Sequence, residues 1–362
     1  MKVYYIGMGY QSCYYVRCLQ PLIHNGWSGE STSLRTKRVD NKTLFEQAIK
    51  ADVIVFHRPM DINQLKAAVL LKQLGKIIVM DNDDTYIKDS GVPTKMFGKL
   101  NKKLKKAVEK IDDILKKFAS ISDLVTVSTD FLKEEYKEYN SNVITLKNCV
   151  DPLDWSQPKR NEEDTIRIGI VGSVASNKDY EQIKPLLDKL KENPKVVICL
   201  FALPEKKKGN EWAVDIYKPE YEFWNQYNVE WKPFCQIEDY MDTLNNLRLD
   251  LMLIPRYDSY FNRAKSNIKF LEASMCEIPV IARGFEDGLS PYQGKEDSKY
   301  MEIAFTEQDW IDKTLDLIEN KDKRIQMGKK AREYVINNYN IANNAHKWRD
   351  AYLKIWNEKK QS

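Results

Sequence analysis

The residues with the clearest chemical potential lie in the second half of the chain. Basic and polar side chains gather at the expected start of a helix: Arg263, Lys265, Ser266 and Asn267. The N-terminus of a helix offers unpaired backbone N–H groups and the positive end of its dipole, so these residues suit a diphosphate. Glu272 lies inside the same helix, where its carboxylate suits the hydroxyl groups of a ribose. The spacing therefore predicts a nucleoside-diphosphate site.

Two further segments place glycine directly after an expected strand. Gly7-Met8-Gly9 follows the opening strand, and Gly172-Ser173 follows residues 166–171, with Lys178 five residues later. Glycine lets the chain turn tightly into a helix whose N-terminus faces an anion, and a lysine there can meet a diphosphate as a point charge. A tight turn without ligand is the alternative for the first segment, and a solvated loop is the alternative for the second.

Acidic residues follow another expected strand. Asp83 and Asp84 belong to the run Asp81-Asn82-Asp83-Asp84 that follows residues 77–80, at the strand end where parallel sheets place ligands. A carboxylate there is a candidate general base, while a helix cap or a solvated turn is the alternative. His57 and Arg58, at the end of the strand before it, form a weaker pair.

Short β-branched runs alternate with helical patterns up to about Phe305, as in doubly wound parallel sheets. The expected strands of the first half are residues 3–6, 53–56, 77–80, 124–127 and 143–146. Those of the second half are residues 166–171, 196–201, 229–231, 251–254 and 279–282. The main expected helices span residues 62–74, 95–118, 181–193, 237–247 and 268–275, and the chain is helical from Asp309 on.

The pattern divides the chain into two Rossmann-like domains. A polar, proline-bearing stretch at 151–164 has neither a helical nor a strand period, so we expect a linker between a domain at 1–150 and a second at 165–340. In the last helix Trp348, Tyr352 and Trp356 are spaced four apart on one face. We expect residues 341–362 to return to the first domain.

Composition excludes several classes of protein. Only three histidines are present, none in ligand spacing with a cysteine, and the six cysteines are scattered, so neither a transition-metal site nor a disulfide scaffold is expected. The opening residues do not resemble a signal peptide, and no apolar run is long enough to span a bilayer. A cytoplasmic location follows as an expectation.

The segment Lys95–Phe118 has apolar residues on one helical face and lysines on the other. A basic amphipathic helix suits peripheral contact with an anionic membrane, a phosphate-rich acceptor or DNA. A solvated face over a packed core is the alternative.

The stretch from Asn262 to Ala282 resembles the donor-binding segment of GT-B glycosyltransferases, in particular family-4-like bacterial and phage enzymes of the O-antigen or rhamnan type. Asp81 to Asp84, Asn148 to Asp151 and the loop Gly172 to Lys178 match other segments of that family in order. The resemblance implies an α/β GT-B fold, with two Rossmann-like domains facing a central cleft and C-terminal helices packing back across. It also implies catalysis without a bound metal or cofactor.

Roles carried over by position place Lys178, Arg263 and Lys265 on the donor diphosphate and Glu272 on the ribose. Gly9, Gly172, Ser173, Ser266 and Asn267 complete the expected donor site, and Asp83 and Asp84 are the expected catalytic residues. Two positions depart from the family. Ser173 stands where many relatives have arginine, and Ala264 stands where a glutamate normally touches the donor sugar. Sugar identity and anomeric outcome are therefore open.

The leading hypothesis is a hexosyl-type glycosyltransferase that uses a nucleotide-diphosphate sugar and a hydroxyl of a glycan, lipid-linked or polyanionic acceptor. A second is a phage-type enzyme that glycosylates hydroxymethylated pyrimidines in DNA. A third is a non-catalytic sugar-nucleotide or glycan-binding protein with the same fold, motivated by Ser173 and Ala264. The incomplete glycine fingerprint near Gly7 makes a nicotinamide dehydrogenase remote.

Overall fold

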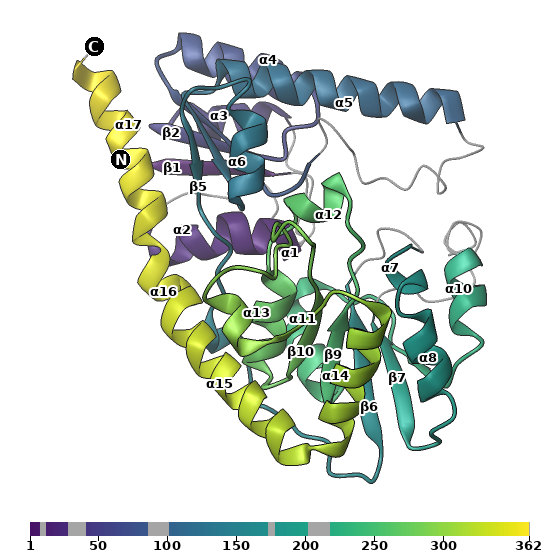
Figure 1. Ribbon diagram of the computed structural model, residues 1–362. Helices are drawn as coiled ribbons and strands as arrows, with labels where there is room; N and C mark the ends of the chain where they lie inside the picture. Colours follow the sequence, from purple (N-terminus) through teal and green to yellow (C-terminus); the bar gives the residue numbers. More distant parts are fainter. Residues whose placement is uncertain (8–11, 28–40, 86–100, 173–177, 202–217, 362) are drawn as a thin grey trace.

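The computed structural model describes residues 1–7, 12–27, 41–85, 101–172, 178–201 and 218–361 of the 362-residue chain. Side chains of residues 41–44 and 101–108 lie outside that description. The chain forms two α/β halves, one above the other, and its last helices run along the edge of both (Figure 1).

The first half contains a parallel sheet whose strands follow the chain in the order β1-β2-β3-β4-β5. Its strands are β1 (Val3–Gly7), β2 (Val53–His57), β3 (Ile77–Asn82), β4 (Leu124–Val127) and β5 (Val143–Thr145). Its helices are α1 (Ser12–Tyr14), the π-helix η1 (Tyr15–Leu19), α2 (Gln20–His24), α3 (Asn41–Ala48), α4 (Ile62–Gln73), α5 (Asn101–Ile121) and α6 (Asp130–Tyr136).

The sequential strand order explains the return of the C-terminal helix. Crossovers of a single hand tend to place successive helices on one face of such a sheet. Alternate strand residues on that face form one core with α3, α4, α5 and α6. The other face packs against η1 and α17 (His346–Gln361), where Trp348 and Tyr352 are fully buried. The aromatic face of α17, which the residue spacing predicts to be packed, thus covers the face of the sheet that the crossover helices leave open (Figure 1).

The second half contains a six-stranded parallel sheet in the order β11-β10-β9-β6-β7-β8. Its strands are β6 (Ile166–Val171), β7 (Val196–Phe201), β8 (Val229–Trp231), β9 (Leu251–Ile254), β10 (Val280–Arg283) and β11 (Glu302–Ala304). Its helices are α7 (Lys178–Glu181), α8 (Lys184–Leu190), α10 (Lys218–Trp224), α11 (Ile237–Asn246), α12 (Tyr260–Ala264), α13 (Ile268–Met275), α14 (Glu307–Glu319) and α15 (Lys321–Tyr339). The short 3₁₀ helices are η2 (Pro152–Asp154) and η3 (Asp297–Tyr300), and α16 (Ile341–Asn344) leads into α17. A core lies on each face of this sheet.

The predicted α/β architecture is confirmed, with two local differences. The helix expected over 181–193 is two short helices, α7 and α8, because Pro185 cannot donate to the preceding turn and instead occupies the first turn of α8. The second difference is the strand β11, which the sequence pattern does not predict because its three residues are too few to show a strand period. Helix α5 forms as expected and buries Leu115 and Phe118 in the first core, although residues 95–100 lie outside the described chain.

None of the six cysteines is disulfide-bonded, and four of them are buried. Within the described residues, every helix is too short or too polar to cross a bilayer.

Candidate functional site

The order of the second sheet fixes where a ligand is expected. From β6 the strands proceed in one direction to β7 and β8, and from β9 they proceed in the opposite direction to β10 and β11. The loops after β6 and β9 therefore separate at the boundary between these two strands, which is the point where open parallel sheets bind ligands. Gly172 follows β6, and α12 and α13 follow β9. Two of the predicted donor segments thus lie side by side.

Gly172 and α13 are in direct contact. The backbone of Gly172 has a φ of +107°, a region that residues with a Cβ rarely adopt. A Cβ at this position would lie 2.7 Å from Cε of Lys269, so a side chain would displace the lysine. The positive φ therefore favours glycine here, and the side chain of Lys269 lies close to Gly172, directly after β6.

The carboxylate of Glu272 is held by two donors on one oxygen. Nζ of Lys269 lies 2.7 Å from Oε2, and the hydroxyl of Tyr240 donates to the same oxygen at 2.8 Å. Burial and the neighbouring charge of Glu272 raise the pKa of Tyr240 well above its ordinary value, so the hydroxyl keeps its proton. Glu272 is 8% exposed. Its carboxylate is therefore fixed in orientation, and no residue in the described part of the chain donates to Oε1.

Lys269 and Tyr240 were not among the predicted site residues. Lys269 precedes Glu272 by three positions, which places the two on one helical face, so helical spacing carries a signal for this pair. Tyr240 comes from α11, and its ring stacks on Phe201 at the end of β7 at a centroid distance of 5.5 Å. That contact joins distant segments and has no counterpart in local sequence.

Of the three remaining predicted donor-site residues, the structure describes one, Lys178. Nζ of Lys178 lies 5.5 Å from the ring centroid of Tyr257, near the start of α7. Gly9 and Ser173 lie outside the described residues.

Arg263 and Lys265 both have carboxylate partners. Arg263 binds Asp258 through two nitrogens at 2.6 and 2.7 Å and Asp287 at 2.5 Å. Nζ of Lys265 lies 2.8 Å from Oδ2 of Asp84, which belongs to the first half. The predicted diphosphate residue Lys265 therefore reaches a predicted catalytic residue across the two halves.

Ser266 and Asn267 connect the start of α13 to residues of both halves. The side chain of Asn148 donates to Oγ of Ser266 at 2.9 Å. Asn267 donates to the buried carboxylate of Asp297 at 2.8 Å, and that carboxylate also accepts from the hydroxyl of Tyr339. The end of the helix expected to face the donor is thus fixed from both sides.

Asp83 and Asp84 follow β3, as expected, and both are buried. Arg58 lies between them, 2.5 Å from Asp83 and 3.5 Å from Asp84. Burial alone would raise the pKa of Asp83, but the charge and hydrogen bond of Arg58 lower it below its ordinary value. Arg58 has a φ of +48°, an uncommon conformation for a non-glycine residue that concentrates at functional sites.

A buried ion pair, Arg17–Asp81, lies next to this acidic turn in the sequence. Arg17, fully buried in η1, binds Asp81 through Nε at 3.1 Å and NH2 at 2.6 Å. Nδ1 of His57 lies 3.0 Å from the same carboxylate. Burial alone would raise the pKa of Asp81, but the charges and hydrogen bonds of Arg17 and His57 outweigh that effect and lower the pKa below its ordinary value. Arg17 was not predicted, because a charged residue in an apolar helix has no local partner.

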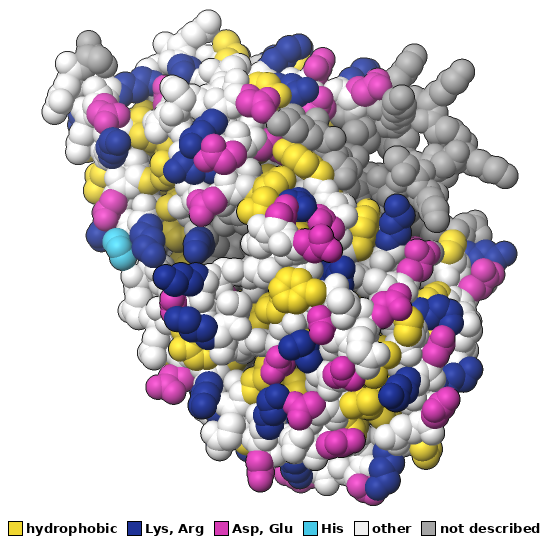
Figure 2. All heavy atoms as spheres, in the orientation of Figure 1, with side chains coloured by type: hydrophobic (Ala, Val, Ile, Leu, Met, Phe, Trp, Pro, Cys, Tyr) yellow, Lys and Arg dark blue, Asp and Glu magenta, His cyan; other side chains and the backbone are white. Residues whose placement is uncertain are grey.

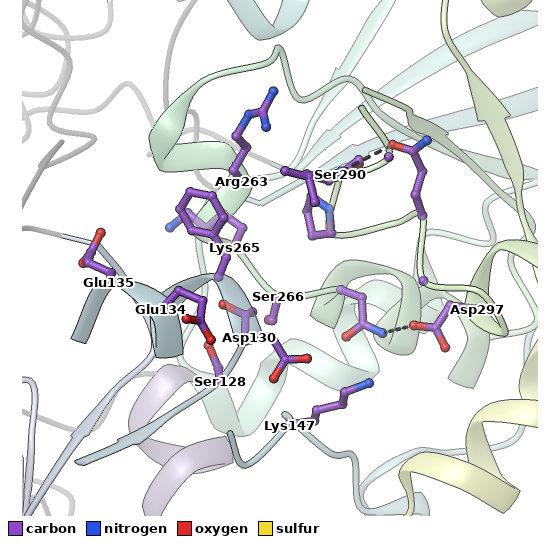
Figure 3. A pocket seen from close by; sticks show the side chains of 18 of the residues that line it. Ser128, Asp130, Glu134, Glu135, Lys147, Arg263, Lys265, Ser266, Ser290 and Asp297 are labelled. Atoms are coloured by element: carbon purple, nitrogen blue, oxygen red, sulfur yellow. Dashed lines mark hydrogen bonds between the residues drawn. The ribbon is translucent and has the colours of Figure 1, made fainter. Parts of the chain in front are cut away.

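A cavity of about 670 Å³ lies between the two halves. Figure 3 shows the side chains of Arg263, Lys265 and Ser266 on one side and those of Asp130 and Glu134 on the other. Gly172, Lys178 and Glu272 are not part of its lining. The structure therefore separates the predicted donor residues into a group around Glu272 and a group facing this cavity.

Over the face seen in Figure 2, basic and acidic side chains are intermingled above both halves. On α5, Lys110 and Lys117 are exposed, while Leu115 and Phe118 pack into the core. This arrangement fits the solvated-face alternative for the lysine-rich segment, and contact with a membrane or DNA stays a prediction.

Residues 182–350 match the family model described as "Glycosyl transferase-like". No curated protein matches the sequence significantly. The part of the chain that contains α13 and Glu272 therefore has a glycosyl transferase-like sequence.

Several solved structures share the fold at low sequence identity. HepE from Anabaena, solved in complex with UDP-glucose, has 13% identity and a TM-score of 0.63 over 98% of this chain and 100% of that chain. A glycosyltransferase from Rickettsia africae ESF-5 has 11% identity and a TM-score of 0.61 over 100% and 99%. TarM has 17% identity and a TM-score of 0.56 over 84% of this chain and 54% of that chain, so the chain spans about half the length of TarM. These matches confirm the predicted GT-B fold.

Proposed function

We propose that this chain, which has the GT-B fold and a glycosyl transferase-like region at 182–350, is a glycosyltransferase. It moves a hexose-type sugar from a nucleotide-diphosphate donor to an acceptor hydroxyl without a bound metal. The observation that carries the proposal is the carboxylate of Glu272, held by Lys269 and Tyr240, with Lys269 close to Gly172 at the switch point of the second sheet.

In this proposal Glu272 accepts hydrogen bonds from the ribose. Lys269 and Tyr240 occupy Oε2 and hold the carboxylate, so the ligand meets a preorganised acceptor at Oε1. The nearby ring of Tyr240, stacked on Phe201, supplies an aromatic surface next to the nucleoside. HepE, which shares the fold, was solved with UDP-glucose, and UDP is therefore the first ligand to test.

The diphosphate lies at the start of α13, where backbone donors and the helix dipole favour negative charge. Lys178 and Lys265 balance the charge that develops on the leaving diphosphate, in place of a metal ion. Arg263, already bound by Asp258 and Asp287, joins the segment before α12 to the segment after β10. Lys265 would leave Asp84 when it binds the donor.

Asp84 is the general base of the proposed reaction if the enzyme inverts the anomeric configuration. Lys265 exchanges Asp84 for the diphosphate, which frees Oδ2 of Asp84 from that ion pair. Asp83 is the weaker candidate because Arg58 holds its pKa below the ordinary value, and a less basic group accepts a proton less readily.

A ligand screen tests the donor site. Nucleoside diphosphates and their sugars, UDP and UDP-glucose first, are added to the full chain while thermal unfolding is followed. A ligand present at about 100 times its Kd adds about 2.7 kcal/mol to the stability of the folded form, so a binder raises the midpoint by several degrees. Slow hydrolysis of the sugar donor distinguishes an enzyme from a non-catalytic binding protein. Absence of both binding and hydrolysis across the panel contradicts the proposal.

Substitution of the two acidic residues tests the base. We expect Asp84→Asn to lower kcat by about 10²- to 10³-fold, since general-base catalysis contributes on this scale. Donor affinity should be kept or increased, because Lys265 loses its competing partner. Asp83→Asn, the matched neighbour, should lower kcat by less than about tenfold, because its base strength is already suppressed by Arg58. The reverse order of effects in steady-state kinetics would assign the base to Asp83.

A further inference from the structure

A buried carboxylate that the proposed reaction does not use joins two segments at the switch point of the second sheet. Asp179 lies on α7, directly after Lys178, and is 3% exposed. It binds the segment 256–262, which follows β9, and Gln182 next to α7 donates to the backbone carbonyl of Pro255 at 2.6 Å. Figure 1 shows α7 and α12 at the end of the second half that lies toward the first half. Because β6 and β9 are adjacent strands, these contacts connect the two chain segments between which a ligand is expected.

Three donors from the segment after β9 converge on the carboxylate of Asp179. The backbone N–H of Tyr257 donates to Oδ1 at 2.9 Å, and Nδ2 of Asn262 donates to the same oxygen at 3.1 Å. NH1 of Arg256 lies 3.3 Å from Oδ2. Asn262 is fully buried and also donates to the backbone carbonyl of Tyr257 at 2.9 Å. The turn that leads into α12 is therefore fixed to α7 through one charged acceptor.

Tyr257 connects this junction to the cation expected on the diphosphate. Its ring centroid lies 5.5 Å from Nζ of Lys178, and its backbone N–H is the one that Asp179 accepts. Two consecutive residues of α7 thus contact one residue of the segment after β9, the first through the ring and the second through the backbone. A shift of Tyr257 relative to α7 would move the aromatic surface next to the ammonium group of Lys178.

We propose that Asp179 is a positioning residue for the donor diphosphate: it holds Tyr257 against α7 and thereby sets the place of the Lys178 ammonium group. The inference rests on the proposed function, in which Lys178 meets the diphosphate, and adds to it a residue that does not touch the ligand. A cation that is already in place loses less conformational freedom when the ligand binds. This gain concerns the phosphate end of the ligand, because the nucleoside end is assigned to Glu272 and Tyr240.

The ratio of UDP affinity to uridine affinity isolates the contribution of the diphosphate. Isothermal titration gives both dissociation constants for the wild type, Asp179→Ala and Asp179→Asn. Alanine removes all three contacts of the carboxylate, whereas asparagine keeps an oxygen that can accept from Tyr257 and Asn262. Asp188→Ala, at an exposed carboxylate of α8 that binds Lys184, is the matched control. If another nucleoside diphosphate binds better in the ligand screen, it and its own nucleoside are used instead.

We expect the wild type and Asp188→Ala to bind UDP much more tightly than uridine. In Asp179→Ala this ratio falls about tenfold, because a hydrogen bond to a charged group contributes on this scale. The affinity for uridine is unchanged, which also shows that the variant is folded, and Asp179→Asn lies between the wild type and Asp179→Ala. The direction is decisive, because removal of a carboxylate near an anion, without displacement of the lysine, would strengthen UDP binding in both variants.

A double variant tests whether Asp179 acts through Lys178. In Lys178→Met, which has already lost the cation, a further Asp179→Ala substitution should leave the ratio of UDP to uridine affinity unchanged. If Asp179→Ala does not fold, Asp179→Asn serves in both comparisons. Tighter UDP binding in the Asp179 variants, an equal loss of UDP and uridine affinity, or additive effects of the two substitutions overturns the positioning role. Failure of the wild type to bind any nucleoside diphosphate or its sugar instead counts against the proposed function.

Discussion

Replacing Glu272 by glutamine should lower the affinity for the nucleoside diphosphate by about 100-fold, equivalent to about 3 kcal/mol. The carboxylate is the proposed acceptor for ribose hydroxyls, and hydrogen bonds to a charged group contribute about 1.5–3 kcal/mol each. Glutamine keeps the shape of the side chain but removes its charge, and Lys269 loses the carboxylate that it contacts at 2.7 Å. Isothermal titration of the wild type and the variant with UDP, or with the nucleotide that binds best, measures the change.

The sugar of the ligand provides the decisive control for Glu272. Wild-type protein should bind the ribonucleotide more tightly than the corresponding 2′,3′-dideoxynucleotide, and Glu272→Gln should bind the two almost equally, because the group that reads the hydroxyls has changed. Glu319→Gln, at an exposed position of α14, is the matched substitution and should leave both affinities unchanged. If Glu272→Gln weakens both ligands by the same factor, Glu272 acts on the fold of the site and not on the ribose.

The donor segment could be predicted from sequence because its signals are local. Ser266, Asn267 and Glu272 occur within one helical pattern that begins after a loop and ends before a strand, and the structure places them on α13 and its N-terminus. Gly172 could be predicted for the same reason, since it follows a strand directly. The environments of these residues could not be predicted, because they come from residues distant along the chain.

Arg263 illustrates that limit. Its sequence position favoured a diphosphate ligand, but two carboxylates, five and 24 residues away along the chain, bind its guanidinium. Tyr240 is a second case, because α11 meets Glu272 only through the packing of the second sheet. The cavity between the halves is a third, because its lining combines residues of α6 with residues of α12, which lie far apart along the chain.

The Arg17–Asp81 pair carries the largest expected effect on stability. Both groups are buried, and Arg17 also donates to the backbone carbonyl of Leu146 and to the side chain of Asn148 at 3.2 Å. Removing one partner leaves the other charge buried without compensation, which costs about 3–5 kcal/mol. We expect Arg17→Met and Asp81→Asn each to lower the free energy of unfolding in urea by this amount at pH 7.

A double variant measures the interaction between Arg17 and Asp81 apart from the other contacts of each residue. Because neither charge remains, Arg17→Met, Asp81→Asn should be destabilised by less than the sum of the single substitutions, with an interaction free energy of at least about 1 kcal/mol. Lys116→Met, on the surface of α5, breaks a half-exposed ion pair with Asp112 and should change stability by less than about 1 kcal/mol. Additive single effects would show that Arg17 and Asp81 stabilise the fold independently.

The same pair predicts how stability depends on pH. The pKa of Asp81 in the folded protein is lowered despite burial, chiefly by Arg17, whereas an unfolded aspartate titrates near about 3.9. A group with a depressed folded pKa contributes stability that is fully present above its unfolded pKa and is lost as pH falls toward the folded pKa. The urea midpoint of the wild type should therefore drop as pH falls below about 4 to 5, and this drop should be smaller in Asp81→Asn.

Because Arg17 contacts Asn148, which in turn donates to Ser266, the loss of the ion pair should also loosen the start of α13 and weaken nucleotide binding before global unfolding. Nucleotide titrations between pH 4 and 7 measure this, and binding that stays constant while the urea midpoint falls would show that the ion pair does not support the donor site.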